Sequence, residues 1–140
     1  MEQMQQKMRV LRAVTYQPSC YGELLAYQLA FNETMRLNET LPLLNEEESP
    51  LVPKLIEAAG EVCALLAAAW EVRRYKAQFL ESLQAAEGVA AKVQTWVAFA
   101  VECGYLSVED GEIHRDLYED VLKEIRDLIR TADIVVRLVA

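Results

Sequence analysis

The stretch FLESLQAAEGVAAKVQTWVAFAVECGYLS, residues 79–107, decides the fold because it carries a long apolar pattern and then a sharp stop. Its apolar side chains recur alternately four and three positions apart, at Phe79, Leu83, Ala86, Ala90, Val93, Val97 and Ala100. This spacing places all of them on one face of an α-helix. Glycine favours the left-handed backbone conformation just past a helix end. Gly104 therefore predicts that the helix ends near Cys103.

The residues after the stop predict a second helix. Ser107, followed three positions later by Asp110, resembles a capping box, in which the first side chain caps the helix N-terminus. Gly111 would lie in the first turn, where glycine costs roughly 1 kcal/mol relative to alanine, so we expect the helix to start somewhat later. Residues 103–107 thus predict the tight corner of a helical hairpin.

Two other segments carry the same alternating pattern. One contains Val52, Leu55, Ala59, Val62, Leu66 and Ala69, and the other contains Val121, Ile125, Leu128, Ala132, Val135 and Val139. A first helix, closed by Leu41 and Pro42, is less regular, and we expect its inward stripe to comprise Tyr21, Leu24, Phe31 and Met35. Ser49 and Pro50 suit the cap and first position of the second helix.

The segment that contains Val52 to Ala69 and the segment that starts at Phe79 are predicted to be two helices joined by a reversal, not one continuous helix. Continuing the earlier stripe would place Arg73 and Lys76 on the apolar face, and the later stripe restarts at Phe79. A single helix from Pro50 to Cys103 would also extend roughly 80 Å, too long for a compact domain of this size. We predict an all-α fold, an antiparallel up-down four-helix bundle over residues 18–140. Residues 1–17 are expected to form an extra N-terminal helical arm or a frayed tail.

Composition bounds the function. The 140 residues suit one domain, and the net charge of −8 argues against a free-standing nucleic-acid binder, because phosphate contacts need clustered lysine and arginine. Residues 1–16 lack a secretory pattern, and no apolar run approaches a membrane span. The three cysteines are odd in number and lack metal-type spacing, which favours a reducing, cytoplasmic compartment.

The sequence offers few candidates for chemistry. His114 is the single histidine, and Asp110 lies four residues earlier, so the two could share a helix face as metal ligands or a proton-transfer pair. The favoured interpretation is a surface imidazole. Cys20, Cys63 and Cys103 are interpreted as core cysteines. No motif for catalysis, metal or cofactor binding is found, so we expect no enzyme, no metal and no cofactor.

Two sets of residues are candidates for contacts with partners. The basic cluster of Arg73, Arg74 and Lys76 could contact nucleic acid or a partner, although an ion pair within or between subunits is the stronger interpretation. Apolar residues beside the main stripes predict an oligomer interface, because soluble monomers avoid large apolar patches. These residues are Leu25, Leu29, Leu80, Val101, Leu122, Ile129 and Val136.

Three stretches carry a family resemblance: YQLAF at 27–31, AAGEVCALLAAAWEVRRYKAQFLESLQAAEG at 58–88, and QTWVAFAVECGYLS at 94–107. Together they resemble the bacterial four-helix-bundle family first described from intervening sequences in 23S ribosomal RNA genes. The accessory variability proteins of diversity-generating retroelements are relatives of that family. The resemblance implies an antiparallel bundle, frequent assembly into homopentamers, and no catalytic residue to carry over.

The retroelement relatives use a basic ring to hold reverse transcriptase and RNA, and this chain departs from that pattern. Ile56 and Glu57 stand where the family commonly has arginines, and Glu61 stands where it has serine. The expected function is therefore a cytoplasmic, non-catalytic oligomeric scaffold or adaptor that docks a protein partner, with a pentamer favoured over a dimer. The alternative is an accessory protein associated with RNA or a ribonucleoprotein.

Overall fold

The computed structural model describes residues 1–5 and 18–139, and every regular element in these ranges is a helix. A short 3-10 helix η1 (Tyr21–Glu23) precedes the α-helices α2 (Leu25–Thr40), α3 (Leu51–Glu71), α4 (Lys76–Glu102), α5 (Val108–Arg130) and α6 (Ala132–Val139). The predicted all-α class is confirmed. Of the N-terminal arm expected over residues 1–17, residues 2–5 form a helical turn, and residues 6–17 lie outside the described part.

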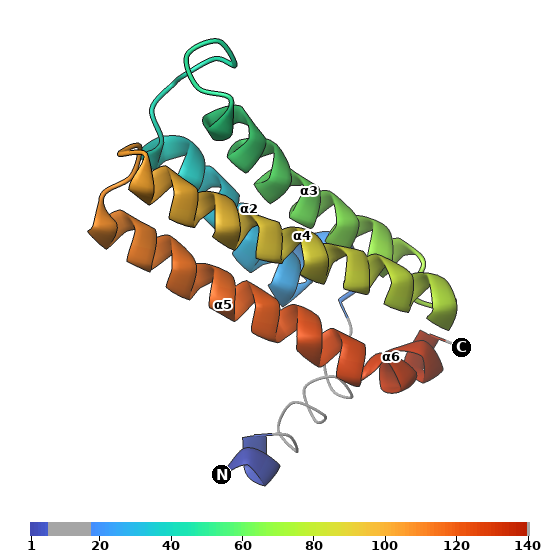
Figure 1. Ribbon diagram of the computed structural model, residues 1–140. Coiled ribbons are helices and arrows are strands. Elements are labelled where there is room, and N and C mark those ends of the chain that lie inside the picture. Colours follow the sequence, from blue (N-terminus) through green and yellow to red (C-terminus); the bar gives the residue numbers. More distant parts are fainter. Residues whose placement is uncertain (6–17, 140) are drawn as a thin grey trace.

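The four long helices α2 to α5 lie side by side around one core (Figure 1). Helix α3 packs on α4, α4 packs on α5, and α2 contacts both α3 and α5. The apolar stripes predicted for α3 and α4 are buried along their whole length. In the third stripe Val121, Ile125, Ala132 and Val135 are buried and Leu128 is half-buried. The alternating spacing therefore identified three of the four inward faces.

The stripe predicted for α2 was wrong at three of its four positions, and only Leu24, which directly precedes the helix, is buried. Tyr21, Phe31 and Met35 are 39%, 46% and 45% exposed. The buried face of α2 instead consists of Ala26, Ala30, Glu33 and Leu37. Small alanine side chains let the helix approach its neighbours closely, and the single carboxylate on this face has a partner on α5. The larger aromatic side chains are left on the outside.

The predicted corners are present. Helix α3 ends at Glu71 and α4 begins at Lys76, which confirms the reversal between them. Gly104 has φ 81°, and the backbone N–H of Tyr105 donates to the carbonyl of Ala100 at 2.8 Å, the bond that closes a left-handed helix end. The Ser107 hydroxyl oxygen accepts from the backbone N–H of Asp110 at 3.0 Å.

Other boundaries refine the expectation. The Ser49 hydroxyl oxygen accepts from the N–H of Val52 at 3.4 Å, as the predicted cap requires. The last patterned segment is not one helix, because α5 ends at Arg130 and α6 starts at Ala132. The Thr131 hydroxyl donates to the carbonyl of Asp127 at 2.7 Å, a bond of the kind that often accompanies a bend in a helix. Within the described residues, no helix has the length and apolar character needed to cross a membrane.

Gly111 has a packing role that its sequence position did not reveal. Helix α5 already starts at Val108, so the later start expected from this glycine was wrong. Gly111 is buried, and a Cβ at this position would lie 2.3 Å from Cγ2 of Val101 on α4. The absence of a side chain therefore allows α4 and α5 to meet closely beside their corner.

We expect Gly111→Ala to destabilise the protein by about 1–3 kcal/mol, the usual cost of overpacking, despite alanine's better helix propensity. The matched control is Gly88→Ala within α4, where an added Cβ meets nothing within 4 Å. The control should gain about 0.5–1 kcal/mol. Denaturant unfolding of both variants checks the prediction, and a stabilised Gly111→Ala would contradict it.

Candidate functional site

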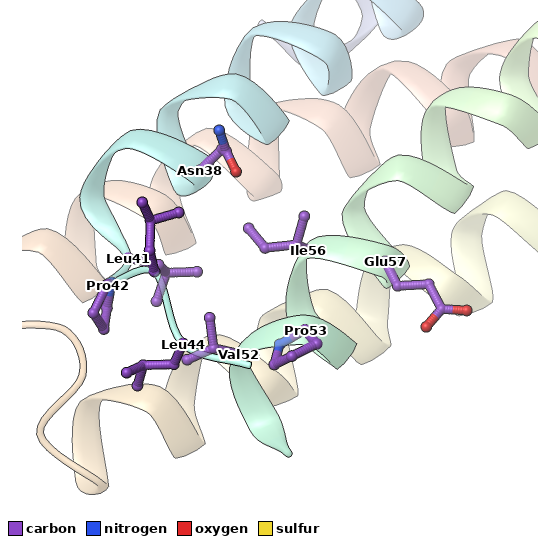
Figure 2. Close-up of a pocket in the computed structure, with 9 residues that line it drawn as sticks. Asn38, Leu41, Pro42, Leu44, Val52, Pro53, Ile56 and Glu57 are labelled. Atoms are coloured by element: carbon purple, nitrogen blue, oxygen red, sulfur yellow. The ribbon is translucent and has the colours of Figure 1, made fainter. Parts of the chain in front are cut away.

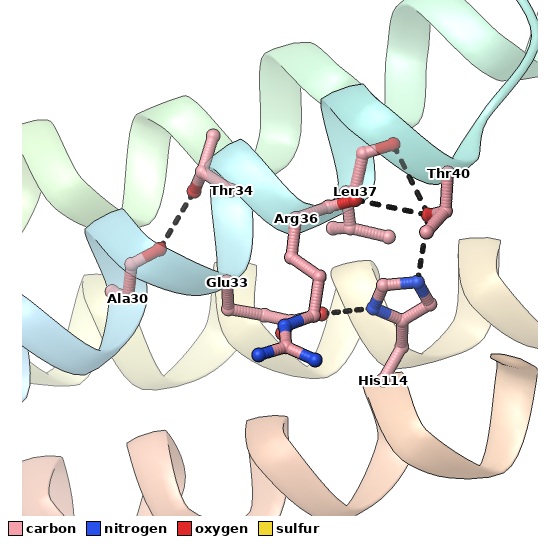
Figure 3. A network of polar contacts seen from close by, with 7 residues as sticks. All are labelled: Ala30, Glu33, Thr34, Arg36, Leu37, Thr40 and His114. Atoms are coloured by element: carbon pink, nitrogen blue, oxygen red, sulfur yellow. Dashed lines mark hydrogen bonds and ion pairs between the residues drawn. The ribbon is translucent and has the colours of Figure 1, made fainter.

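A buried polar contact joins α2 to α5 (Figure 3). Glu33 and His114 are 2% and 1% exposed. Nδ1 of His114 contacts Oε1 of Glu33, and Nε2 lies 2.9 Å from the hydroxyl oxygen of Thr40. The expectation of a surface imidazole at His114 was therefore wrong. The imidazole is in the core because both of its nitrogens find partners on α2.

The spacing on α2 explains how one helix supplies both partners. Glu33 and Thr40 are seven residues apart, two helical turns, and so lie on one face of α2. The Thr40 hydroxyl donates to the carbonyl of Arg36 at 3.0 Å, which leaves its oxygen free to accept. Each imidazole nitrogen therefore has a hydrogen-bonding group on α2, the carboxylate at Nδ1 and the hydroxyl at Nε2.

Three further side chains with polar groups, Thr34, Cys63 and Tyr118, lie near this contact. The Thr34 hydroxyl donates to the carbonyl of Ala30 at 2.8 Å and lies 3.5 Å from Sγ of Cys63. Burial raises the pKa of the Cys63 thiol and, strongly, that of the Tyr118 phenol. Both groups are thus held neutral, which makes Cys63 a poor nucleophile. The core assignment of the cysteines holds for Cys63 alone, since Cys20 and Cys103 are exposed.

The geometry of the buried pair favours a structural role. With both side chains almost fully enclosed, a substrate has no path to the carboxylate or the imidazole in this conformation. Oε2 of Glu33 has no hydrogen-bond partner among the described residues. Asp110, the partner considered for His114 in the sequence, instead belongs to the N-terminal cap of α5. In the described ranges no group of three His, Cys, Asp or Glu side chains is placed to hold a metal.

The basic cluster at the α3–α4 turn makes contacts within the chain. Nη1 of Arg73 donates to the carbonyl of Trp70 at 2.8 Å, and the guanidinium lies 4.7 Å from the centroid of the Trp70 ring. Lys76 forms an ion pair with Asp133 of α6. Arg74 is exposed. Two of the three cations therefore make contacts within the fold, of which only the Lys76 contact is an ion pair.

The residues predicted for an oligomer interface have mixed positions. Leu122 lies in the core at 2% exposure and has no surface to offer another subunit. Leu25 is 38% exposed. The other five are half-buried and pack against the core: Leu29, Leu80, Val101, Ile129 and Val136.

A different apolar surface is exposed on α2 and on η1, which precedes it. We call Tyr21, Tyr27, Phe31 and Met35 the α2 outer face. The ring centroids of Tyr21 and Tyr27 are 5.0 Å apart, and those of Tyr27 and Phe31 are 5.9 Å apart. Residues 27, 31 and 35 recur every four positions, so they lie along one side of the helix. The sequence pattern had placed Tyr21, Phe31 and Met35 on the inside of the fold.

A pocket of about 360 Å³ opens beside the C-terminal end of α2 (Figure 2). We call it the α2–α3 pocket. It is lined by Asn38, Leu41, Pro42, Leu43, Leu44, Val52, Pro53, Ile56 and Glu57. No pattern in the sequence predicted a pocket between the segments that flank residues 45–50.

Comparison of the chain with protein-family models, curated proteins and solved structures finds no match. The resemblance to the 23S intervening-sequence family therefore stays a prediction.

Proposed function

We propose that this protein is a non-catalytic helical scaffold of the cytoplasm that assembles with copies of itself and docks a protein partner. The observation that carries the proposal is the α2 outer face. Its exposed members, Tyr21, Phe31 and Met35, are 39–46% exposed, and the intervening Tyr27 ring joins two of them. Aromatic and methionine side chains are enriched in the centres of protein interfaces.

The assembly proposal follows from the energetics of that surface. An apolar strip along a helix gains free energy when another surface removes it from water. In a closed ring of identical subunits, each such face is covered without an open end. The family resemblance favours five subunits, and a dimer is the alternative. We further propose that α2 to α5 form the antiparallel up-down bundle predicted from the sequence, which the pairwise packing of neighbouring helices supports.

The alternative of direct RNA association has less support. Arg73 contacts Trp70 and the exposed Lys76 pairs with Asp133, so two of the three cations already have contacts within the chain. Phosphate binding would need several such cations acting together, and the chain carries a net charge of −8.

Light scattering over a range of concentrations tests self-association. We expect a mass that is a multiple of 15.9 kDa, and a fall toward the single-chain mass when Phe31→Ser and Met35→Ser are combined. Phe99→Ser is the matched control, because Phe99 is a phenylalanine of 51% exposure on α4 rather than α2. A wild-type protein that stays at the single-chain mass at every concentration would overturn the proposal.

A further inference from the structure

We propose that the α2–α3 pocket is the docking site for a basic segment of the partner protein, which inserts one large apolar side chain and places lysine or arginine residues on the surrounding carboxylates. This inference rests on the proposed scaffold function and adds to it the position and the chemistry of the partner.

The lining is suited to an apolar anchor. Seven of its nine side chains are leucine, valine, isoleucine or proline, and only Asn38 and Glu57 carry polar groups. The volume of about 360 Å³ lies in the range of roughly 300–1,000 Å³ that is usual for ligand sites. Leu43, at the edge, is 94% exposed. A partner side chain seated here would remove this leucine from water together with its own apolar surface.

The charge around the pocket is negative. Glu57 belongs to the lining, and Glu46, Glu47 and Glu48 are exposed in the loop that joins its two halves. Among the described residues, none of these four carboxylates forms a salt bridge. Lys54, a cation in the same stretch of α3, lies 6.0 Å from the centroid of the Trp96 ring on α4. A basic segment is therefore attracted, whereas an RNA or an acidic peptide is repelled.

The loop is held in place rather than left to be ordered by the partner. Oδ1 of Asn45 accepts from the backbone N–H groups of Glu47 and Glu48, each at 3.0 Å. The carbonyl of Asn45 accepts from the N–H of Ser49 at 2.9 Å, and Ser49 is buried as the cap of α3. A pre-formed site loses less conformational entropy on binding than a flexible one.

The same features argue against a second copy of this chain as the occupant. Two copies related by a two-fold axis through the pocket would bring their 46–48 carboxylates together, and like charges across an interface oppose binding. The α2 outer face carries no acidic side chain among its four members, so it fits self-association better than this pocket does.

Selection from a phage-displayed library of random 12-residue peptides against the full chain tests the proposal. We expect the enriched peptides to share at least two lysines or arginines around a leucine, isoleucine or phenylalanine. The affinity of a synthetic enriched peptide should fall at least tenfold for Leu43→Ser and for the combined Glu46→Lys, Glu47→Lys and Glu48→Lys variant. Glu81→Lys, an exposed carboxylate on α4, should bind the peptide as the wild type does.

Three results would overturn the proposal: no enriched peptide, enriched peptides without basic residues, or a basic peptide that binds the Leu43→Ser and triple-lysine variants as tightly as the wild type. Retention of the wild-type mass in both variants, measured by light scattering, separates this test from that of self-association. If the wild-type chain stays at the single-chain mass and still binds the peptide, self-association is refuted and the assignment of the pocket is retained.

Discussion

Replacing Glu33 and His114 together by leucine is expected to cost much less stability than replacing either one alone. Each single change leaves the other polar group in a site that is at most 2% exposed, and breaking a buried pair in this way typically costs about 3–5 kcal/mol. The double variant removes both groups at once. Oε2 of Glu33 has no hydrogen-bond partner among the described residues. The hydrogen-bonding capacity of the pair is therefore incompletely used, and its removal lowers the free energy of unfolding only a little.

Denaturant unfolding of the wild type, the two single variants and the double variant gives the coupling energy between the sites. We expect at least half of the summed single-variant loss to disappear in the double variant. Strictly additive losses would show that Glu33 and His114 do not depend on each other, which would contradict the role of this contact in joining α2 to α5.

Val93→Asp is expected to unfold the protein at ambient temperature or to leave it barely folded. Val93 is fully buried in the middle of α4, and an unpaired carboxylate there costs several kcal/mol. That loss is comparable to the whole stability of a typical domain, about 5–15 kcal/mol. Lys92→Asp, at the adjacent exposed position, is the control and should melt close to the wild type. Thermal unfolding followed by circular dichroism measures both, and a wild-type melting curve for Val93→Asp would remove this residue from the core.

The parts of the fold that the sequence predicted are those fixed by local spacing. The alternation along α3 and α4 specifies an inward face without reference to any other helix. The α4–α5 corner is equally local, because Gly104 and Ser107 determine the backbone over a few residues. The break at Thr131 was missed because no glycine or proline marks it, and a threonine that bonds backward does not by itself end a helix, as Thr34 within α2 shows.

The orientation of α2 could not be predicted in the same way. Its buried face includes Glu33, whose carboxylate can be buried only because His114, 81 residues later in the chain, supplies a partner for it. Apolarity alone then selected the wrong side, the one with Phe31 and Met35. The α2–α3 pocket depends likewise on how the end of α2 meets the start of α3. Such long-range contacts leave no periodic pattern in the sequence.

The residues predicted for the oligomer interface show the same limit of prediction from local spacing. Periodicity identifies the side of a helix but not how closely the neighbouring helices cover it. Leu122 lies one position from the Val121 stripe and is buried, because α5 contacts both α2 and α4. The exposed apolar side chains of α2 could be recognised only after its buried face was known.

The central claim, that the α2 outer face is the surface of assembly, is tested most directly by methionine methyl NMR with a soluble paramagnetic probe. The chain has four methionines, and Met35 is the one on this face. Met1, which is fully exposed, serves as the internal reference. We predict that the relaxation enhancement of the Met35 methyl group falls as the concentration rises through the assembly transition, while that of Met1 stays unchanged. A Met35 signal that keeps its full enhancement in a sample shown to be oligomeric would contradict the claim.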